Sequence, residues 1–199
     1  MRFVLASASP ARLATLRSAG VAPEVVVSGV DDSAIAADSP RELVQLLARA
    51  KACAVRDMVG ADALVLGCDS MLELDGQVYG KPASADVAAD RWRSMRGRSG
   101  VLHSGHELVG PHFAASATAS TTVFFADVSD DEIDRYCATG EPAAVAGGFT
   151  VDGLGGWFID RIDGDHHNVV GLSLPLLRRM LREHGLGLED LGYPSKAIS

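Results

Sequence analysis

Lysine is scarce in this sequence. Lys51, Lys81 and Lys196 are the three lysines, and arginine supplies the other 15 of the 18 basic residues. The formal net charge is −8, so the chain lacks the clustered basic residues that a broad nucleic-acid-binding face requires. We therefore expect no nucleic-acid partner. A small anionic ligand is not excluded, because a few well-placed cations can form a local site whatever the total charge.

Cysteine and long apolar runs are also sparse. Cys53, Cys68 and Cys137 show no paired spacing, which favours buried thiols in a reducing compartment over disulfides or a zinc site. No apolar run approaches the roughly 20 residues that a membrane span requires. The apolar stretch over residues 3–6 is too short for the core of a signal peptide. These absences predict a cytoplasmic protein with no membrane partner.

The hydrophobic pattern predicts an α/β protein in which short strands alternate with amphipathic helices. The predicted strands cover residues 2–6, 24–30, 63–70 and 121–128, and residues 101–127 are predicted to form paired strands around a loop. The first predicted helix begins at Ser9-Pro10 and ends at Gly20. Four further helices are predicted over residues 39–58, 84–95, 129–140 and 173–185. A tight hairpin turn is predicted at Asp75-Gly76, and a small mobile loop over residues 110–120. Residues 147–164 are predicted to form short strands interrupted by glycines.

No internal repeat divides the chain, and no linker is rich enough in Pro, Gly or Ser to separate independent domains. We therefore expect residues 1–199 to form a single domain, with two lobes that share a core. That core is expected over about residues 3–182. Residues 186–199 are expected to form a loose C-terminal tail.

Hydroxyl side chains follow the first predicted strand at once. Ser7 and Ser9 precede Pro10 and Arg12, so the strand leads through small polar residues into a helix N-terminus. Such an N-terminus attracts anions through its backbone N–H groups and its dipole, and Arg12 adds a bidentate donor. Taken alone, the stretch is explained more simply as a helix cap followed by a solvent-exposed arginine.

Acidic residues follow two of the predicted strands. Asp69 comes directly after a buried run, at the sheet edge where α/β proteins place their ligands, and could bind a divalent metal or act as a general base. A turn-forming aspartate is an equally good interpretation. Asp32 could complete a magnesium site, although surface turns explain most such acids. The histidines lack a third ligand at suitable spacing, so we expect no zinc site in either pair, His103 with His106 or His166 with His167.

Lys51 and Lys81 gain meaning only as members of a set. Each lysine alone is typical of a solvated surface position. Together with Arg12 and Asp69, they resemble a site for a triphosphate and a metal ion. Cations there neutralise phosphate oxygens, while a carboxylate holds the metal or activates water.

Seven ordered motifs between Phe3 and Leu181 resemble those of the Maf family, the septum-formation-inhibitor-like nucleotide pyrophosphatases. In chain order they are LASASPAR, ARAKACAV, LVLGCDSML, YGKP, MRGRSGVLHSG, GEPAAVAGGFTVDG and IDGDHHNVVGLSLPLL. One such motif would be weak evidence, whereas seven in the right order form a specific pattern.

This resemblance implies an enzyme that hydrolyses nucleoside triphosphates to monophosphate and pyrophosphate with a divalent metal, Mg²⁺ or Mn²⁺. It implies a Maf/ITPase-like α/β fold, with a central elongated mixed sheet, flanking helices and two lobes around a substrate cleft, often as a homodimer. Members are also linked to division arrest at septum formation and to clearing non-standard or modified nucleotides.

The resemblance also assigns roles to individual residues. The catalytic base corresponds to Asp69, and an acid associated with metal corresponds to Asp32. The positions that bind phosphate correspond to Ser7, Arg12, Lys51 and Lys81, and Ser9 shares their turn. Water would attack the α-phosphorus while the cations stabilise the phosphates and the leaving pyrophosphate. Asp69 would either bind the metal or deprotonate that water.

Three positions depart from the subgroup that acts on dTTP and UTP. That subgroup has a threonine, a glutamine and a lysine where this chain has Ser70, Asp152 and Val145. An amide both donates and accepts hydrogen bonds, whereas an ionised carboxylate only accepts. Asp152 therefore favours a base edge that presents donors, and the preferred base stays open. So do two alternative functions: an ITP/XTP-type pyrophosphatase, and a nucleotide-binding regulator of cell division with little turnover.

Overall fold

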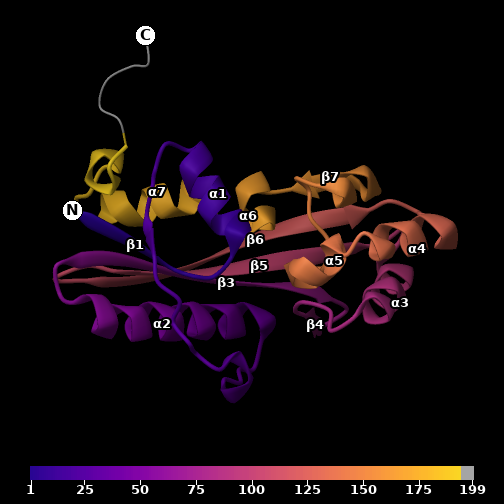
Figure 1. The fold of residues 1–199 in the computed structure, drawn as a ribbon, viewed down its shortest axis with the longest axis horizontal. Helices are drawn as coiled ribbons and strands as arrows, with labels where there is room; N and C mark the ends of the chain where they lie inside the picture. The colour runs from indigo at the N-terminus through magenta and orange to yellow at the C-terminus, as the bar shows by residue number, and fades with distance from the viewer. Residues whose placement is uncertain (194–199) are drawn as a thin grey trace, which may run out of the picture. The chain divides into compact units, whose positions relative to one another are not determined.

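The structure, a computed structural model, describes residues 1–193 and has a mixed α/β fold. Its strands form a seven-stranded sheet in the order β2-β1-β3-β5-β6-β7, with β4 paired to β3 (Figure 1). The strands are β1 (Arg2–Ala6), β2 (Glu24–Val25), β3 (Ala63–Leu74), β4 (Gln77–Tyr79), β5 (Ser99–Val109), β6 (Ala114–Phe125) and β7 (Ile159–Asp163). The predicted class, a mixed sheet with flanking helices, is confirmed.

Helices of very different lengths flank the sheet. The α-helices are α1 (Pro10–Ser18), α2 (Pro40–Val59), α3 (Ala85–Met95), α4 (Asp130–Ala138), α5 (Glu141–Ala144), α6 (His166–Val170) and α7 (Leu174–Glu183). Short 3₁₀ turns are η1 (Asp32–Ala34), η2 (Ala146–Gly148), η3 (Leu154–Phe158) and η4 (Leu188–Leu191). The caps predicted at Ser9, Ser39, Ser84 and Ser129 all accept a hydrogen bond from a first-turn N–H.

The described chain divides into two compact units. Unit 1 comprises Met1–Asp69, Ser104–Ala119 and the residues from Gly171 on, and unit 2 comprises Ser70–His103 and Ser120–Val170. Strands β3, β5 and β6 contribute residues to both units. The assignment of the whole chain to a single domain stays a prediction.

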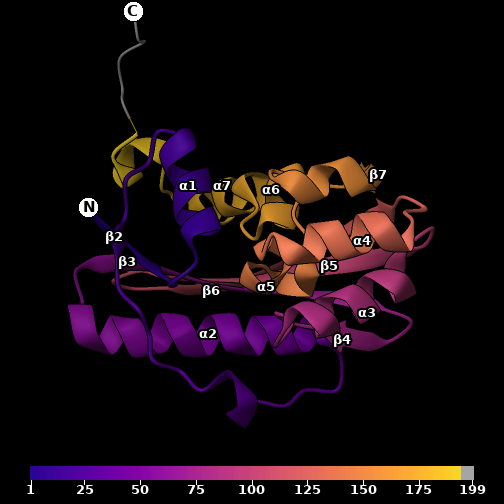
Figure 2. The same cartoon turned by 45° about the vertical axis from the view of Figure 1, so that its right-hand side comes forward.

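Unit 1 is built on the parallel strands β1, β2 and β3. Leu5 pairs with Leu66, and Ala6 pairs with Gly67. Because side chains alternate across a strand, one face of β1 and β3 packs against helix α2, and the other packs against α1 and α7 (Figures 1 and 2). The strands therefore read as continuous apolar runs, which is the pattern that made them recognisable.

Two glycines let α2 lie unusually close to its sheet. A Cβ atom at Gly67 would lie 2.2 Å from Ala48 O, and one at Gly105 would lie 2.2 Å from Val44 O. Real Cβ atoms do not approach backbone so closely, so both positions require glycine. The long helix is thereby held directly against β3 and β5, with Lys51 on the turn that faces Asp69 in the middle of β3.

Two sequence predictions in unit 1 are wrong in extent. The strand predicted over 24–30 is only Glu24–Val25, and Gly29, within the predicted range, adopts a left-handed conformation (φ 66°). Much of the loop predicted over 110–120 is strand β6. Its small residues alternate: the alanines pack on the core, while Ser116 and Thr118 hydrogen-bond to Glu107 and Gln45.

Unit 2 has its own core, centred on Trp92 of α3. Edge-to-face contacts join this ring to Phe125, Tyr136 and Phe158 at centroid distances of 5.5–5.9 Å. The buried indole Nε1 donates to Gly148 O at 2.9 Å, so its polar group is satisfied. Helices α3 and α4 pack together, and Arg93 of α3 reaches Asp134 of α4 at 2.7 Å (Figure 2).

The turns of unit 2 agree only in part with the sequence predictions. The hairpin at Asp75-Gly76 is confirmed: both residues have positive φ (52° and 76°) and join β3 to β4. The glycine-rich stretch 147–164 contains one strand, β7, and otherwise forms 3₁₀ turns. Its glycines serve close backbone approaches and left-handed turns, such as Gly147 at φ 73°, which strands do not use.

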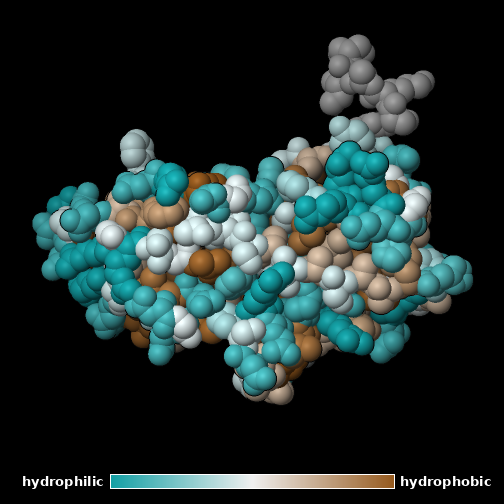
Figure 3. Space-filling view, turned by 180° about the vertical axis from the view of Figure 1, so that it is seen from behind, coloured by the Kyte–Doolittle hydropathy of each residue, from teal (hydrophilic) through white to brown (hydrophobic). Residues whose placement is uncertain are grey.

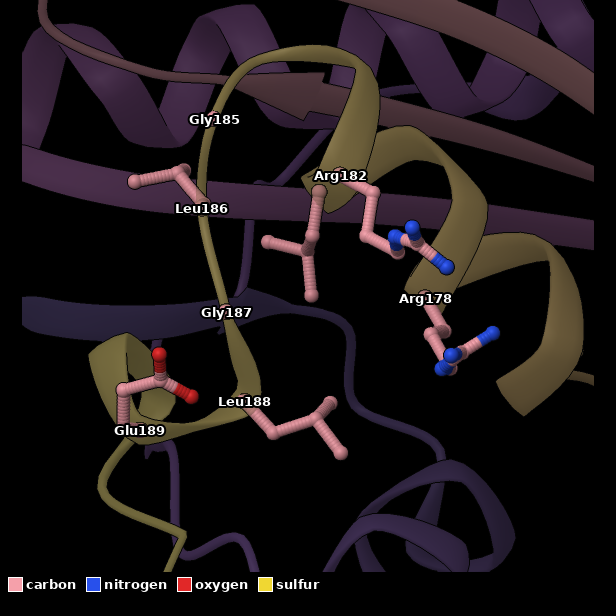
Figure 4. Close-up of a pocket in the computed structure, with 8 residues that line it drawn as sticks. Arg178, Arg182, Gly185, Leu186, Gly187, Leu188 and Glu189 are labelled. Atoms are coloured by element: carbon pink, nitrogen blue, oxygen red, sulfur yellow. The ribbon is translucent and has the colours of Figure 1, made fainter.

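The predicted C-terminal tail begins as packed structure. Leu186 and Leu188 pack against the core of unit 1, and Leu191 of η4 is buried within it. The rest of that prediction, residues 194–199, lies outside the described residues. A cavity of about 440 Å³ lies at the end of α7, lined by Arg178, Arg182 and residues of the 185–189 turn (Figure 4).

Several large apolar side chains are exposed. The face in Figure 3 shows hydrophobic residues interspersed among hydrophilic ones. Trp157, with 86% of its area exposed, is the most exposed of the large apolar residues described. Across residues 1–193, none of the helices combines the length and the apolarity that crossing a bilayer requires.

Candidate active site

The turn after β1 is held together by its own hydroxyl groups. Ser9 caps α1 by accepting from the Arg12 N–H at 3.4 Å, and Pro10 occupies the first helical position. Ser7 Oγ accepts from the Ser9 N–H at 3.2 Å. The predicted cap at Ser9 is therefore confirmed, and Ser7 is buried at the end of the strand.

Arg12 is not the solvated surface residue that the local sequence favours. Its Nε donates to Gly171 O at 2.9 Å, and its Nη1 donates to Ser7 Oγ at 3.0 Å. Two bonds from different edges fix the plane of the guanidinium as well as its position. A fixed, planar donor next to a helix N-terminus is suited to phosphate oxygens.

Asp69 sits in β3 against a lysine of α2. Its Oδ1 lies 2.6 Å from Lys51 Nζ, and the same ammonium lies 2.9 Å from Asp32 Oδ2 of η1. The side chains of Asp69 and Lys51 are only 11% and 14% exposed, whereas that of Asp32 is 51% exposed. Lys51 thus joins three segments that the sequence singled out separately.

This cluster follows from the packing at Gly67. Gly67 and Asp69 point to the same face of β3 because they are two residues apart. The missing side chain at Gly67 admits Ala48 and Ala52 of α2, and Lys51 lies on the same helix between them in sequence. Because α2 lies so close to β3 at Gly67, Lys51 reaches the carboxylate of Asp69, the next residue on that face of the strand.

Cys68 is the residue before Asp69 in β3. The charges of Arg12, Asp69 and Lys51 all act on its thiol, so both clusters lie near it. Burial nevertheless dominates and raises the pKa of Cys68 to about 12. The thiol stays protonated at neutral pH, which excludes Cys68 as a nucleophile.

The structure brings six of the predicted site residues into unit 1 and leaves three in unit 2. Those in unit 1 are Ser7, Ser9, Arg12, Asp32, Lys51 and Asp69, and those in unit 2 are Ser70, Lys81 and Asp152. Ser70 is buried next to Asp69 in β3, and Lys81 is exposed in the turn after β4. The gathering of all nine around one ligand stays a prediction.

Asp152 has a partner that sequence reasoning did not foresee. Its Oδ1 lies 2.8 Å from Nε2 of His166, and both side chains are about half exposed. Since a carboxylate only accepts, Nε2 carries the proton in this bond. Val145 ends α5 in extended conformation and leads into η2.

Asp32 and Asp69 have the composition of a magnesium site. Mg²⁺ is commonly held by one or two carboxylates together with substrate phosphates and water. The two carboxylates already converge on one cation, the Lys51 ammonium. Among residues 1–193 no group of three or more His, Cys, Asp or Glu side chains could enclose a metal ion. Two carboxylates that converge on one cation fit a metal that substrate phosphates help to hold.

Gly171 contacts the candidate site in a way that the sequence did not reveal. It lies in the closing motif, but only the folded chain shows that its carbonyl holds Arg12, 159 positions away. Its φ of 115° is a conformation that other residues rarely adopt. A glycine before the helix that starts at Ser173 was the one available signal.

Comparison with known proteins gives consistent matches. The family model described as "Maf-like protein" matches residues 2–184. A protein of Salinispora tropica named "Nucleoside triphosphate pyrophosphatase" is 59% identical over 197 residues, covering 96% of this chain and 87% of that protein. One of Streptomyces coelicolor with the same name is 56% identical over 200 residues, covering 98% and 96%.

A more distant similarity is found among solved structures. A nucleoside-triphosphatase (dITP/XTP pyrophosphatase) of Mycobacterium abscessus is 17% identical, with a TM-score of 0.42 over 64% of this chain and 76% of that one. This overlap is too small to choose between related activities. The family model and the curated relatives each span nearly the whole chain, and on that basis the chain belongs to the family of Maf-like proteins.

Proposed function

We propose that this protein is a nucleoside triphosphate pyrophosphatase, which hydrolyses nucleoside triphosphates to monophosphate and pyrophosphate. The observation that carries this proposal is the Asp32–Lys51–Asp69 cluster, which lies in one unit with the fixed guanidinium of Arg12. The names of the relatives support the same activity. The reaction belongs to the hydrolases that act on acid anhydrides.

Arg12 and Lys51 would supply the positive charge for the triphosphate. Arg12 is held by Gly171 and Ser7 before substrate arrives, so little reorganisation is needed when phosphate binds. Lys51 would keep its bond to Asp69 or exchange it for a phosphate oxygen. Lys81 would add a third cation from unit 2. Each cation would stabilise negative charge that grows on the leaving pyrophosphate.

Asp69 would handle the attacking water. Its carboxylate is nearly buried and contacts the Lys51 ammonium at 2.6 Å. It would orient the water toward the α-phosphorus and accept its proton. A divalent metal, Mg²⁺ or Mn²⁺, would be held by Asp32 and Asp69 and would supply charge neutralisation at the phosphates.

Asp152 and His166 would contact the base. The pair presents carboxylate oxygens and an imidazole where the dTTP/UTP subgroup carries an amide. We expect Asp152→Gln to raise kcat/KM for UTP and dTTP relative to purine nucleotides. An unchanged ranking across the panel would contradict a role for Asp152 in base selection.

A nucleotide panel with and without metal tests the function. The purified protein is incubated with standard, inosine, xanthosine and methylated triphosphates in Mg²⁺, Mn²⁺ or EDTA, with pyrophosphate and orthophosphate assayed separately. The proposal expects pyrophosphate in the metal arms and its loss with EDTA. Preference for ITP and XTP would favour the ITP/XTP-type enzyme. Tight binding without turnover would favour a regulator of cell division.

The setting of the activity is proposed on the same basis. We propose a cytoplasmic enzyme that acts as a homodimer and that clears nucleotides, including modified ones. Sedimentation at micromolar concentration tests the dimer, since a single species at 20.8 kDa would contradict it.

A further inference from the structure

His106 is a buried histidine that the proposed mechanism does not use. It lies on β5 in unit 1, and none of its surface is exposed. Its Nδ1 lies 3.0 Å from Ser104 O, and its Nε2 lies 2.9 Å from the backbone nitrogen of Ser173. Both ring nitrogens are thus engaged by backbone groups.

Those two partners determine the tautomer of the imidazole. A backbone carbonyl only accepts, so Nδ1 carries a proton and donates it to Ser104 O. A backbone N–H only donates, so Nε2 is unprotonated and accepts from Ser173. His106 is therefore a neutral acceptor directed at Ser173, the N-cap of α7.

Ser173 lies two residues from the carbonyl that holds Arg12. It is the N-cap of α7, where its Oγ accepts from the Leu176 N–H at 3.2 Å. Leu172, next to it, is completely buried in the core of unit 1. Gly171 then presents its carbonyl to Arg12 Nε at 2.9 Å. The chain from Gly171 to Ser173 is thus fixed at its far end by His106.

We propose that His106 is a positioning residue that fixes the segment from Gly171 to Ser173 and so directs the Arg12 guanidinium toward the substrate's phosphates. The proposal rests on the proposed function, because it requires Arg12 to bind phosphate. Without the acceptor at Nε2, the buried Ser173 N–H loses its partner and the segment shifts to find another. The Gly171 carbonyl moves with the segment, and the Arg12 guanidinium is no longer held in the orientation that binds phosphate.

Two amide variants separate the two bonds of the ring. His106→Gln places a side-chain oxygen near the position of Nε2 and keeps an acceptor for Ser173. His106→Asn reaches only the position of Nδ1 and keeps a donor for Ser104 O. We expect His106→Asn to lower kcat/KM for a triphosphate substrate about tenfold, the factor expected for one lost buried hydrogen bond. His106→Gln should stay within about threefold of the wild type.

His184→Asn provides a matched control in the same unit. His184 is exposed and stacks on Phe113 at a centroid distance of 4.1 Å, whereas Arg12 is held by Gly171 and Ser7. This variant should leave kcat/KM unchanged. Equal losses in His106→Asn and His106→Gln would overturn the proposal, because they would trace to the ring's packing rather than to the Ser173 bond.

A double-mutant cycle with Arg12→Ala gives the decisive readout. If His106 acts through Arg12, His106→Asn should cause no further loss of kcat/KM in the Arg12→Ala background. It should still lower the midpoint of thermal unfolding by the same amount in both backgrounds. Losses in kcat/KM that multiply independently would overturn the proposal and leave His106 a packing residue.

The same cycle separates a failure of the proposed function from a failure of the inference about His106. Wild-type kcat/KM in Arg12→Ala would remove Arg12 from phosphate binding and so contradict the proposed function. A large loss in Arg12→Ala with none in His106→Asn would contradict the inference about His106 alone. If His106→Asn does not fold, the cycle is run with His106→Gln, for which a loss in kcat/KM above about threefold overturns the proposal.

Discussion

Lys51 shows how much a single residue depends on its neighbours in the fold. In the sequence it is an isolated cation on a helix of alanine and leucine, where a solvated position is the ordinary expectation. In the structure it is nearly buried and contacts Asp69 and Asp32. Arg12 changes in the same way, from a first-turn surface residue to one held by Gly171 and Ser7.

Removing the Lys51 charge should destabilise the protein as well as inactivate it. Lys51→Met leaves Asp69 almost buried without its cation, next to a second carboxylate. Breaking a pair of this kind costs about 2–3 kcal/mol, less than a fully buried pair because water still reaches both groups. We expect kcat/KM to fall about 100-fold, with stability measured by urea unfolding. Arg17→Met, an exposed change on α1, should stay within about 0.5 kcal/mol of the wild type. Similar stabilities for the two variants would show that Lys51 forms only a surface pair.

At the scale of elements, strand-to-helix turns with serine caps were recognisable from sequence because their signals are local. Ser9, Ser39, Ser84 and Ser129 each cap the helix that the pattern predicts. The alternating small residues of β6 were misjudged because alanine and serine carry little hydrophobic contrast. Strand β2 was predicted too long because its apolar run continues beyond the two residues that pair as a strand. The close packing of α2 against Gly67 depends on a contact between segments that are distant in sequence, which no local pattern encodes.

A side chain added at Gly67 should displace α2 from the sheet. A Cβ at Gly67 would meet backbone atoms, Ala48 O at 2.2 Å and Ala52 N at 2.8 Å, which cannot rotate away. Gly67→Ala should therefore cost about 1–3 kcal/mol of unfolding free energy and separate Lys51 from Asp69. Gly80→Ala meets nothing within 4 Å and should leave stability nearly unchanged. Equal unfolding free energies for the two variants would mean that α2 does not depend on Gly67.

A carboxylate anchors the glycine-rich turn of unit 2. Burial raises the pKa of the Glu141 carboxyl, whereas hydrogen bonds accepted from the N–H groups of Gly155 and Leu154 and from the Tyr136 hydroxyl lower it. The hydrogen bonds dominate, so the pKa of Glu141 lies below its ordinary value of 4.5. Since the folded pKa lies below the unfolded value, the carboxylate stabilises the fold above about pH 4.5, and that stability is lost as pH falls through the lower folded pKa. Glu141→Gln should flatten the decline of the unfolding midpoint between pH 5 and pH 3. A slope equal to the wild type's would contradict this role.

At the scale of the whole molecule, the two units share strands. β3 runs without interruption from Ala63 to Leu74, and Asp69 is its last residue in unit 1. The family and the fold class were predictable, because ordered motifs survive in sequence, whereas the phosphate-binding roles of the site residues stay a prediction. The division into units was not, because it depends on which distant residues share a core, as Trp92 does with Phe125 and Phe158.

Shared strands predict one cooperative unfolding transition. Trp92 and Trp157 both lie in unit 2, so tryptophan fluorescence reports that unit, whereas far-UV circular dichroism reports both. Leu66→Ala, a fully buried change in unit 1, should lower the midpoints of both signals equally and cost about 2–5 kcal/mol. A fluorescence midpoint that stays at the wild-type value would show that the units unfold separately and are distinct domains.

The central claim is tested most directly by the products formed by the wild type and by Asp69→Asn. The amide keeps the shape of the side chain but can neither accept a proton from water nor bind a metal as a carboxylate does. With a nucleoside triphosphate and Mg²⁺, the account predicts equimolar nucleoside monophosphate and pyrophosphate from the wild type. It predicts a rate at least about 100-fold lower from Asp69→Asn, while Asp57→Asn, an exposed change on α2, keeps the wild-type rate. Release of orthophosphate alone, or an Asp69→Asn rate within a few-fold of the wild type, would contradict it.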